Sequence, residues 1–532
     1  MSSTKDKDMP ETHVEDASPH VLPPDVNNEM SVSIWDTIKA NPKTIGWCCT
    51  LASGPMVYGF DLIIVSQVVA MPAFQRSFGT LVGTKYIIPS MWLALWNSMI
   101  QVGAMAGALV SGGISDRFGR RTTFLFGAIV TAIATAVIYF SDYPANRESR
   151  RVMFLMGKII AGLAFGLITP AYLTIISEIS PSRLRGPLVS CFTFFTVTAQ
   201  LIGVGLVRSQ VNDVSPSAYH RVFASQWALA GVAIIAGICI PESPIYLIKR
   251  NYMDKALRSY KRLYSHDDPE ARIAALQTVV EHELMAEKNQ DSVSYVQCFK
   301  GTNLRRTRIV IFANVAQQLV GMTFIINMTY FLQLGGMDPA LAVNMNLIKL
   351  AIGIVFLFGT FWTMTWFGRR TLMLVGSAVA AVFWAAVGIA GFFSSPEALL
   401  FIGLGMIIVY EAYALSVGAV YPVVASEASS VRLRAVSNSI GFVSQFFAAW
   451  LFGFTVPYMF GADAGNLGGK TGFIFAGLSI ICGVVSWVDI PETKNRTYAE
   501  LDEMYEMNLP TRQFKNFVCT GIQVPHVKSE DA

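Results

Sequence analysis

Long runs of apolar residues recur twelve times along this sequence, and each is close to the length of a helix that crosses a lipid bilayer. About 20 helical residues span the ~30 Å hydrocarbon core. The runs are rich in Gly, Ala and Thr, which suit close helix packing in lipid. We place them at 45–71, 87–114, 122–140, 152–176, 188–209, 222–240, 309–334, 341–365, 371–393, 400–425, 436–459 and 470–489. The pattern predicts twelve transmembrane helices.

The low charge content of the chain supports a membrane location. Of its 532 residues, 53% are hydrophobic and only 14% are charged, whereas about 25% of the residues in soluble domains are charged. A soluble protein of this composition would have too few polar side chains to cover its surface. The first apolar run also begins too late and is too long for a cleavable signal peptide. We therefore expect an all-α, multi-pass membrane protein.

The distribution of basic residues gives the expected orientation of the chain. With twelve spans, both termini lie on one side, and that side collects 30 of the 40 Lys and Arg residues, against 8 on the other. Basic loops stay in the cytosol, so we expect cytosolic termini, with the plasma membrane as the host. The loop "NRESRR" at 146–151 is an exception, because it puts three Arg residues on the outer side.

The two halves of the chain repeat each other at a fixed offset. The loop "SDRFGRRTTFLFG" begins at Ser115 and its counterpart "MTWFGRRTLMLVG" begins at Met364, 249 residues later. The offset between Glu178 in "SEISPSRLRG" and Glu427 in "SEASSVRLRA" is again 249, and "PESP" and "PETK" differ by 250. Three motif pairs in one register indicate a parallel duplication of six spans.

Two six-span halves joined by a polar segment are the architecture of a transporter whose substrate site lies between the halves near the midplane. A channel fits less well because nothing resembles a pore-loop filter. An enzyme fits less well because no nucleophile–base pair and no metal-ligand cluster has a recognisable spacing. The expected units are a disordered N-terminal tail except near "SIWDTIKANP" (1–44), a first bundle (45–248), a linker (249–308), a second bundle (309–490) and a C-terminal tail (491–532).

Charged residues at the cytosolic helix ends recur with the repeat. Carboxylates near the "GRR" loops can form charge-assisted hydrogen bonds between neighbouring helices. If those bonds form in the outward-open state and break in the inward-open state, they set the conformational equilibrium. Alternatively, the arginines only keep the loops in the cytosol. The candidate gating residues are Asp116, Arg120, Arg121, Glu178 and Arg185 in the first half, and Arg369, Arg370, Glu427 and Arg434 in the second.

A carboxylate, Asp61, lies in the middle of the first apolar run, "GPMVYGFDLIIVSQVVAMP". A charge at the bilayer centre costs roughly 2.5–3.5 kcal/mol on insertion scales, so intramembrane ionisable residues are functional candidates by default. The other spans contain Lys158, Lys349 and Glu411. Lys349 and Glu411 match no motif; they either pair with each other, or Lys349 extends its ammonium toward the interface.

Four motifs, "GGISDRFGRR", "PESPIYLIKR", "QQLVGM" and "PETKNRTYAELDEMY", resemble the signatures of the sugar porter family of the major facilitator superfamily over residues 45–515. Further segments, including "AMPAFQRSFG", "KYIIPSMW", "INMTYF" and "LPTRQFKNF", are similar to fungal maltose and alpha-glucoside permeases. The resemblance implies two six-helix bundles, a small cytosolic helical domain within 249–300, and a central sugar site.

The resemblance also implies a role for Asp61, which matches the first-helix aspartate of proton-linked sugar porters. Its basic partner lies on the fourth helix, where the family usually has Arg and this chain has Lys158. A nearby cation favours the ionised acid, whereas burial favours the neutral acid, so the group can switch. We hypothesise that a proton from outside releases Lys158 and permits inward rocking. The alternative is a static ion pair that holds two helices together.

Amide and aromatic side chains are suited to sugars, because amides pair with adjacent hydroxyls and rings cover the pyranose C–H face. By resemblance, the sugar-contacting positions are Gln200, Gln317, Gln318, Thr323, Tyr421, Gln445 and Phe446. Thr323 stands where many hexose porters have Asn, and Phe446 where several have Trp. The segment "GAVYP" at 418–422 also departs from the usual pattern. Disaccharide and monosaccharide substrates therefore both stay open.

Together these features predict a monomeric, proton-coupled sugar symporter that imports an alpha-glucoside or a hexose by alternating access. Its expected partners are the sugar, protons and the lipid bilayer, with no cofactor, no metal and no nucleic acid. One alternative is the same fold carrying another polyhydroxylated metabolite, such as a polyol, a sugar acid or a secondary metabolite, in either direction. Another is a sugar receptor that does not transport; a long signalling tail would be typical of such a receptor.

Overall fold

The computed structural model describes residues 34–517 except 84, 182–183, 265–267, 290–294 and 431–432. Within this part of the chain, twelve helical segments are long and apolar enough to cross a membrane, so the twelve predicted spans are confirmed. Most of the predicted N-terminal tail and the last part of the C-terminal tail lie outside the described residues. The segment "SIWDTIKANP" contributes helix α2, Ile34–Ala40.

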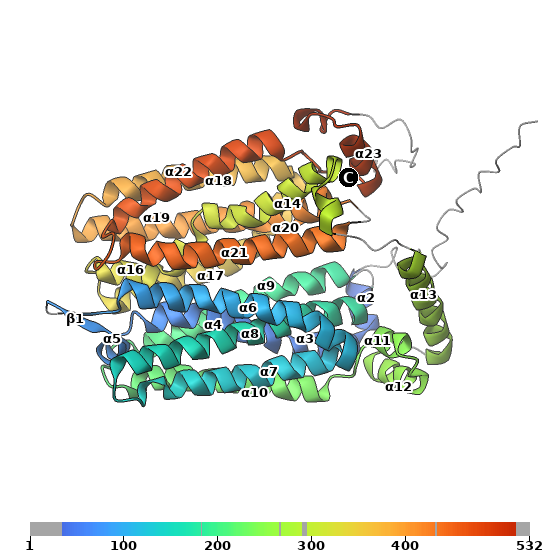
Figure 1. Cartoon of the computed structure of the whole chain (residues 1–532), viewed down its shortest axis with the longest axis horizontal. Coiled ribbons are helices and arrows are strands. Elements are labelled where there is room, and N and C mark those ends of the chain that lie inside the picture. Colours follow the sequence, from blue (N-terminus) through green and yellow to red (C-terminus); the bar gives the residue numbers. More distant parts are fainter. Residues whose placement is uncertain are drawn as a thin grey trace, which may run out of the picture.

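The first six spans form one bundle, drawn in blue to green in Figure 1. The spans are built from α3 (Pro42–Leu51) with α4 (Ser53–Val68), α6 (Ser90–Phe118), α7 (Arg120–Tyr139) with the short 3₁₀ turn η1 (Phe140–Asp142), α8 (Arg147–Ile179), α9 (Arg185–Gln210) and α10 (Ser217–Cys239). Between α4 and α6 the chain forms the short helix α5 (Pro72–Phe78) and a small antiparallel hairpin, β1 (Thr80–Val82) and β2 (Lys85–Ile87). Neither the hairpin nor α5 was predicted from the sequence.

The last six spans form the second bundle, drawn in yellow to red in Figure 1. The helices are α14 (Thr302–Leu319), α15 (Met322–Ile326), α16 (Met328–Leu334), α17 (Pro339–Trp366), α18 (Arg369–Ala390), α19 (Pro396–Leu415), α20 (Val417–Ala428), α21 (Arg434–Phe460) and α22 (Thr471–Asp489), with the 3₁₀ turn η3 (Gly468–Lys470) before α22. The bundles meet where α6 packs on α21 and α9 packs on α17.

Small residues allow the helices of the first bundle to pack closely, as expected in lipid. Gly162 and Gly166 of α8 lie directly against the backbone of α6. A Cβ atom on Gly162 would lie 2.1 Å from the carbonyl oxygen of Ile100, and one on Gly166 would lie 2.3 Å from that of Ala104. This contact fixes the position of α8 against α6. Lys158 lies on α8, one turn before Gly162.

The two ends of the bundles differ, and we name them by what they carry. The hairpin end carries β1 and β2; the linker end carries α11 (Pro244–Lys249), α12 (Met253–Leu263), α13 (Pro269–Asn289), η2 (Tyr295–Phe299), α23 (Tyr498–Glu506) and η4 (Thr511–Gln513). Buried side chains of α11, α12 and α13, such as Tyr246, Ala256 and Ile273, form a small core of their own.

A break in the seventh span directs polar side chains inward. Gly321 adopts φ +96°, the left-handed region that favours glycine, and ends α14 after Leu319. Trp384 closes the break by donating its indole N–H to the carbonyl of Val320 at 2.7 Å. A side chain at Gly321 would meet the Trp384 ring at 2.9 Å. The break separates Gln318 from Thr323 in sequence and leaves their side chains in contact.

Candidate functional site

A fully buried carboxylate and a fully buried ammonium meet at the centre of the first bundle. Asp61 of α4 and Lys158 of α8 are both 0% exposed. Lys158 Nζ donates to Asp61 Oδ2 at 2.5 Å, and Gln226 Nε2 of α10 donates to Asp61 Oδ1 at 3.0 Å. Both carboxylate oxygens therefore have a donor, as a buried charge requires. Three helices contribute to this group, which we name the Asp61 triad.

Two members of the Asp61 triad, Asp61 and Lys158, line a cavity of mixed polar and apolar character between the two bundles. The cavity residues come from α4, α6 and α8 of the first bundle and from α14, α15 and α21 of the second, with Asn327 between α15 and α16. They are Asp61, Leu62, Val65, Trp96, Asn97, Ile100, Gln101, Lys158, Gln318, Thr323, Ile326, Asn327, Ala449 and Gly453. The mixture of amides, a hydroxyl, an aromatic ring and an ion pair is suited to a polar, hydroxylated ligand.

Of the seven positions expected to contact sugar, Gln318 and Thr323 line this cavity, and the Thr323 hydroxyl donates to Gln318 Oε1 at 2.6 Å. Gln317 is buried beside it and accepts a hydrogen bond from the Tyr413 hydroxyl at 3.3 Å. The other four are partly exposed and lie outside the cavity lining; among them, Tyr421 and Gln445 interact with each other. These four are Gln200, Tyr421, Gln445 and Phe446.

Four polar residues of the site were missed from the sequence. Gln226 completes the Asp61 triad, and Asn97, Gln101 and Asn327 line the cavity. Asn97 Nδ2 donates to Asn327 Oδ1 at 3.1 Å, which joins the two bundles. The only signal available was a lone amide within an apolar run, and such an amide serves equally well as a helix–helix contact.

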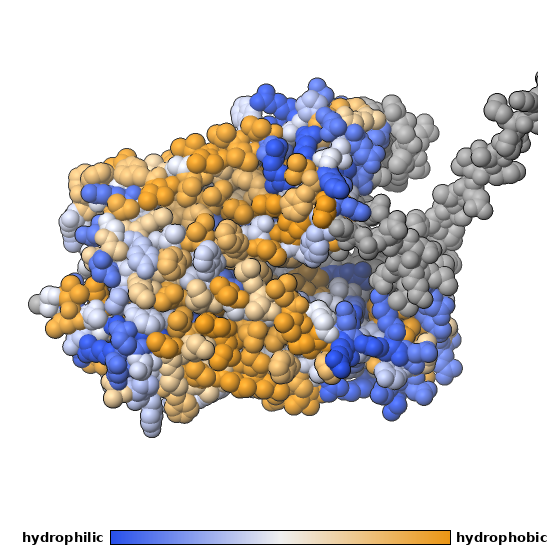
Figure 2. All heavy atoms as spheres, viewed as in Figure 1, coloured by the Kyte–Doolittle hydropathy of each residue, from blue (hydrophilic) through white to orange (hydrophobic). Residues whose placement is uncertain are grey.

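Hydrogen bonds between the two bundles close the hairpin end. Among the described residues, these bonds lie in the half of the spans nearest the hairpin. They join Gln75 to Gln333 (2.9 Å), the backbone N–H of Ile88 to Tyr330 (3.0 Å), the backbone N–H and the hydroxyl of Ser90 to Asp463 (2.8 Å for the backbone N–H), Gln67 to Thr329 (3.1 Å) and Arg208 to Asn344 (2.7 Å). Toward the linker end, the surface between the bundles is hollowed in Figure 2.

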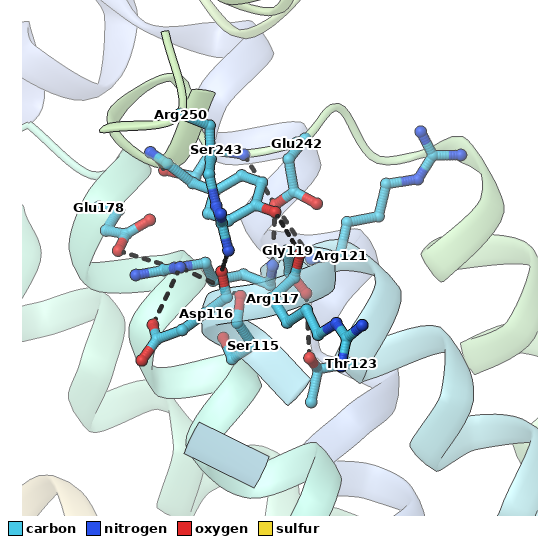
Figure 3. A network of polar contacts seen from close by, with 12 residues as sticks. Ser115, Asp116, Arg117, Gly119, Arg121, Thr123, Glu178, Glu242, Ser243 and Arg250 are labelled. Atoms are coloured by element: carbon cyan, nitrogen blue, oxygen red, sulfur yellow. Dashed lines mark hydrogen bonds and ion pairs between the residues drawn. The ribbon is translucent and has the colours of Figure 1, made fainter. Parts of the chain in front are cut away.

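A network of charges holds the linker end of the first bundle together (Figure 3). Arg120 at the start of α7 pairs with Glu178 of α8 at 3.2 Å and with Asp116 of α6 at 3.4 Å. Glu242 accepts the backbone N–H groups of Arg120 and Arg121 at 3.0 and 3.1 Å. A carboxylate at a helix N-terminus satisfies donors that have no partner within the helix. Burial raises the pKa of Glu242, and the backbone N–H groups oppose that shift.

The second bundle repeats this arrangement. Arg369 pairs with Glu427 at 3.2 Å, and Glu492 accepts the backbone N–H of Arg369 at 2.8 Å. Thr493 donates its hydroxyl to the second oxygen of Glu427 at 2.5 Å. The motif pairs found at offsets of 249 and 250 therefore occupy matching places in the two bundles.

The predicted gating arginines lie in different surroundings. Within the described residues, four of the arginines form no ion pair; these are Arg121, Arg185, Arg370 and Arg434. Arg121 donates to the carbonyls of Gly237 and Ile238, and Arg370 to that of Trp487. A cation is favourable at these helix C-termini. Arg434 instead lies over the Tyr498 ring, 3.9 Å from its centroid.

Both predicted pairs between neighbouring helices are present in this state of the bundles. The Arg120–Glu178 and Arg369–Glu427 pairs are formed while the bundles are closed at the hairpin end. Each pair also lies inside one bundle, so rocking of one bundle on the other does not itself separate it. The sequence identified the partners of each pair. It did not show that both partners belong to the same bundle.

Two six-helix bundles around a shared polar cavity, with a buried ion pair in its wall, define a secondary transporter of the major facilitator type. The family described as "Sugar (and other) transporter" matches residues 47–505. The chain belongs to this family, as its motifs indicated.

Several known proteins are similar to this chain over nearly its whole length. "MFS transporter fmqE" of Aspergillus fumigatus is 33% identical over 93% of this chain and 93% of its own length. "General alpha-glucoside permease" of Saccharomyces cerevisiae is 27% identical over 92% of this chain and 80% of its own length. Among solved structures, the inward-open xylose transporter XylE of E. coli shares the fold, with a TM-score of 0.71 at 20% identity, over 87% of this chain and 99% of its own.

Proposed function

We propose that this protein is a proton-coupled transporter of a sugar or a closely related polyhydroxylated molecule. The observation that carries the proposal is the Asp61 triad in the wall of the cavity, where one proton can cancel a buried charge. Family membership supports the substrate class. The yeast alpha-glucoside permease among the relatives supports it further.

The proposed coupling follows from the donors around Asp61. In the structure, Lys158 and Gln226 both donate to the carboxylate, so each of its oxygens has a donor. Protonation removes the negative charge, frees the ammonium and weakens the link between α4, α8 and α10. Loss of this charge then makes the cavity that Gln318 and Thr323 also line less polar. Release of the proton restores the triad, and each transport cycle thereby moves the proton on Asp61 together with the substrate.

We propose that the linker end faces the cytosol and the hairpin end faces outside, with the plasma membrane as the host. The excess of Lys and Arg at the linker end supports this orientation. The unit boundaries expected from the sequence also stay proposals: bundles at 45–248 and 309–490, a linker at 249–308, and tails at 1–44 and 491–532. We propose that the monomer is the transporting unit, because each bundle supplies one wall of the cavity.

We propose that the substrate is held by amides and hydroxyls from both bundles, with Gln318, Thr323 and Asn97 in the cavity. Gln200, Gln317, Tyr421, Gln445 and Phe446 would join them through rearrangement around the substrate. Gln317 lies next to Gln318, and Tyr421 already interacts with Gln445. Uptake of glucose, maltose and trehalose into liposomes that contain the purified protein, with and without an inward proton gradient, tests the substrate class.

We expect Gln318→Ala to raise the KM for the transported sugar about tenfold. Removal of one neutral hydrogen bond costs up to ~1.5 kcal/mol, and 1.4 kcal/mol is a factor of ten. Counterflow of labelled sugar in liposomes measures the change. Gln277→Ala, on α13 outside the spans, is the matched control and keeps the normal KM. An unchanged KM in Gln318→Ala would remove Gln318 from the substrate site.

A second substrate class has an observation of its own. The Aspergillus relative is 33% identical, against 27% for the permease, and its name specifies no substrate. Transport of a polyol, a sugar acid or a hydroxylated secondary metabolite, including export, uses the same cavity and the same triad. A panel of such compounds in the liposome assay separates this class from sugars. A non-transporting sugar receptor would bind sugar in that assay without counterflow.

We propose that the linker-end pairs hold each bundle rigid during rocking. We expect Glu178→Gln to lower the free energy of unfolding by about 1.5–3 kcal/mol, as for a charge-assisted hydrogen bond, because the Arg120–Glu178 pair is largely buried. The pH dependence of uptake stays normal, since the Asp61 triad is untouched. Thermal unfolding in detergent measures the change against Glu506→Gln, an exposed control on α23. A variant of normal stability but altered pH dependence would contradict this assignment.

A further inference from the structure

A second group of buried polar side chains lies in the other bundle, between α17 and α19. It consists of Asn346 and Lys349 on α17 and Tyr410 and Glu411 on α19. Asn346 is 0% exposed, Lys349 is 2% exposed and Glu411 is 5% exposed. At 1.5 Å per helical residue, Lys349 lies about 15 Å and Glu411 about 22 Å from the hairpin-end start of its helix, so both are inside the membrane. The Asp61 triad does not involve any of them.

These groups are much less well paired than those of the Asp61 triad. Both carboxyl oxygens of Glu411 are buried without a hydrogen-bond partner, and so are both polar atoms of the Asn346 amide. The Lys349 ammonium lies over the Tyr410 ring, 4.8 Å from its centroid. Lys349 and Glu411 form no ion pair within 4.0 Å. The Lys349 ammonium therefore interacts with the Glu411 carboxyl group electrostatically, without donating a hydrogen bond to it.

An acid in these surroundings is stabilised by a proton. A buried carboxylate without donors is strongly unfavourable, whereas the neutral acid carries no charge and its hydroxyl can donate. Lys349 opposes protonation, and the balance between cation and burial makes the group able to switch. The titratable groups that face Glu411 are Lys349 from α17 and Tyr410 from its own helix. From α20, Tyr421 faces Tyr413 instead.

Polar side chains connect this group to the central cavity. Tyr413, two residues after Glu411, faces Tyr410 and donates its hydroxyl to Gln317 Oε1 at 3.3 Å. Gln317 precedes Gln318, which lines the cavity. Tyr410, which lies beneath the Lys349 ammonium, and Tyr413, whose hydroxyl is directed at the substrate region, are three residues apart and share one face of α19.

We propose that Glu411, with Lys349 and Asn346 around it, is a second proton-binding site, located in the second bundle. One O–H bond forms between a carboxyl oxygen and a proton given up by a hydronium ion, which becomes water; the negative charge disappears, and nothing is oxidised or reduced. The proposal deepens the proton coupling proposed above and rests on it. Each bundle then contributes one titratable acid, and a full cycle moves two protons, one on Asp61 and one on Glu411.

Infrared difference spectroscopy of the full-length protein in liposomes tests this site without any substrate. The carbonyl stretch of a protonated carboxyl group is recorded while the pH is stepped from acidic to alkaline. We expect two buried carboxyl bands, of which Glu411→Gln removes one and Asp61→Asn removes the other. Glu397→Gln, on the exposed first turn of the same helix α19, is the matched control and removes neither.

A second variant keeps the test decisive if Glu411→Gln folds poorly. In Lys349→Met the opposing cation is gone, so we expect Glu411 to stay protonated up to the highest pH. Its carbonyl band then no longer changes with pH and is absent from the pH difference spectrum. The site is refuted if the wild-type spectrum contains no band that depends on Glu411 or Lys349. A Glu411 band in a protein that transports no sugar would support the site while refuting the proposed substrate.

Discussion

Asp61→Asn is expected to abolish accumulation of the substrate against its gradient while leaving equilibration across the membrane. Asn is nearly isosteric with Asp, so it keeps the space between α4, α8 and α10 filled and still accepts a hydrogen bond from Lys158 or Gln226. It cannot take up a proton. Uptake by the variant should therefore lose its dependence on external pH.

The size of this effect follows from the proton gradient. One proton crossing 100 mV supplies about 2.3 kcal/mol, and one pH unit adds about 1.4 kcal/mol. Their sum of about 3.7 kcal/mol corresponds to an accumulation of roughly 500-fold per coupled proton. Asp61→Asn reduces this ratio to about one. A proton on Glu411 does not rescue the ratio, because bundles that rock without a proton on Asp61 allow the substrate to slip back.

The measurement is the steady-state ratio of labelled substrate inside and outside liposomes under an imposed proton gradient. Asp254→Asn, on the linker helix α12, removes a carboxylate outside the spans and serves as the control with a normal ratio. Counterflow without a gradient shows that Asp61→Asn still binds and moves substrate. If Asp61→Asn accumulated substrate as well as wild type, Asp61 would be a static structural residue.

The fold was predictable because its strongest determinants are periodic in the sequence. Twelve apolar runs of bilayer length give the spans, and the offset of 249 residues gives the duplication that places Glu178 and Glu427 at matching helix ends. Asp61 and Lys158 were identifiable because ionisable residues within apolar runs are functional candidates, and the resemblance to proton-linked sugar porters implied that they form a pair. Their contact at 2.5 Å joins two residues that are 97 positions apart in the chain.

The rest depended on which side of each helix meets a neighbour, and composition does not encode that. Gln226 and Gln200 are both single glutamines in apolar spans, yet only Gln226 points at Asp61. Arg121 follows Arg120 directly and resembles it in sequence, but one residue of helical rotation turns it to the carbonyls at the end of α10. The role of Gly321 is likewise visible only in the structure, where the indole N–H of Trp384 donates to the carbonyl of Val320 at the helix break.

Lys158→Met is expected to cause the largest loss of stability, because it leaves Asp61 buried with Gln226 as its remaining donor. Removing one partner of a buried ion pair costs about 3–5 kcal/mol, since the other charge stays uncompensated. Unfolding of the purified protein in detergent measures this loss.

The double variant Asp61→Asn/Lys158→Met separates the ion pair from simple packing. With both charges removed, Met fills the space of the Lys stem and Asn keeps the contact with Gln226, so we expect most of the lost stability to return. The two substitutions should therefore be strongly non-additive, as expected for residues in direct contact. Additive losses would mean that Lys158 stabilises α8 through its apolar stem alone. In that case the pair would lack the energy needed to link proton binding to the movement of the bundles.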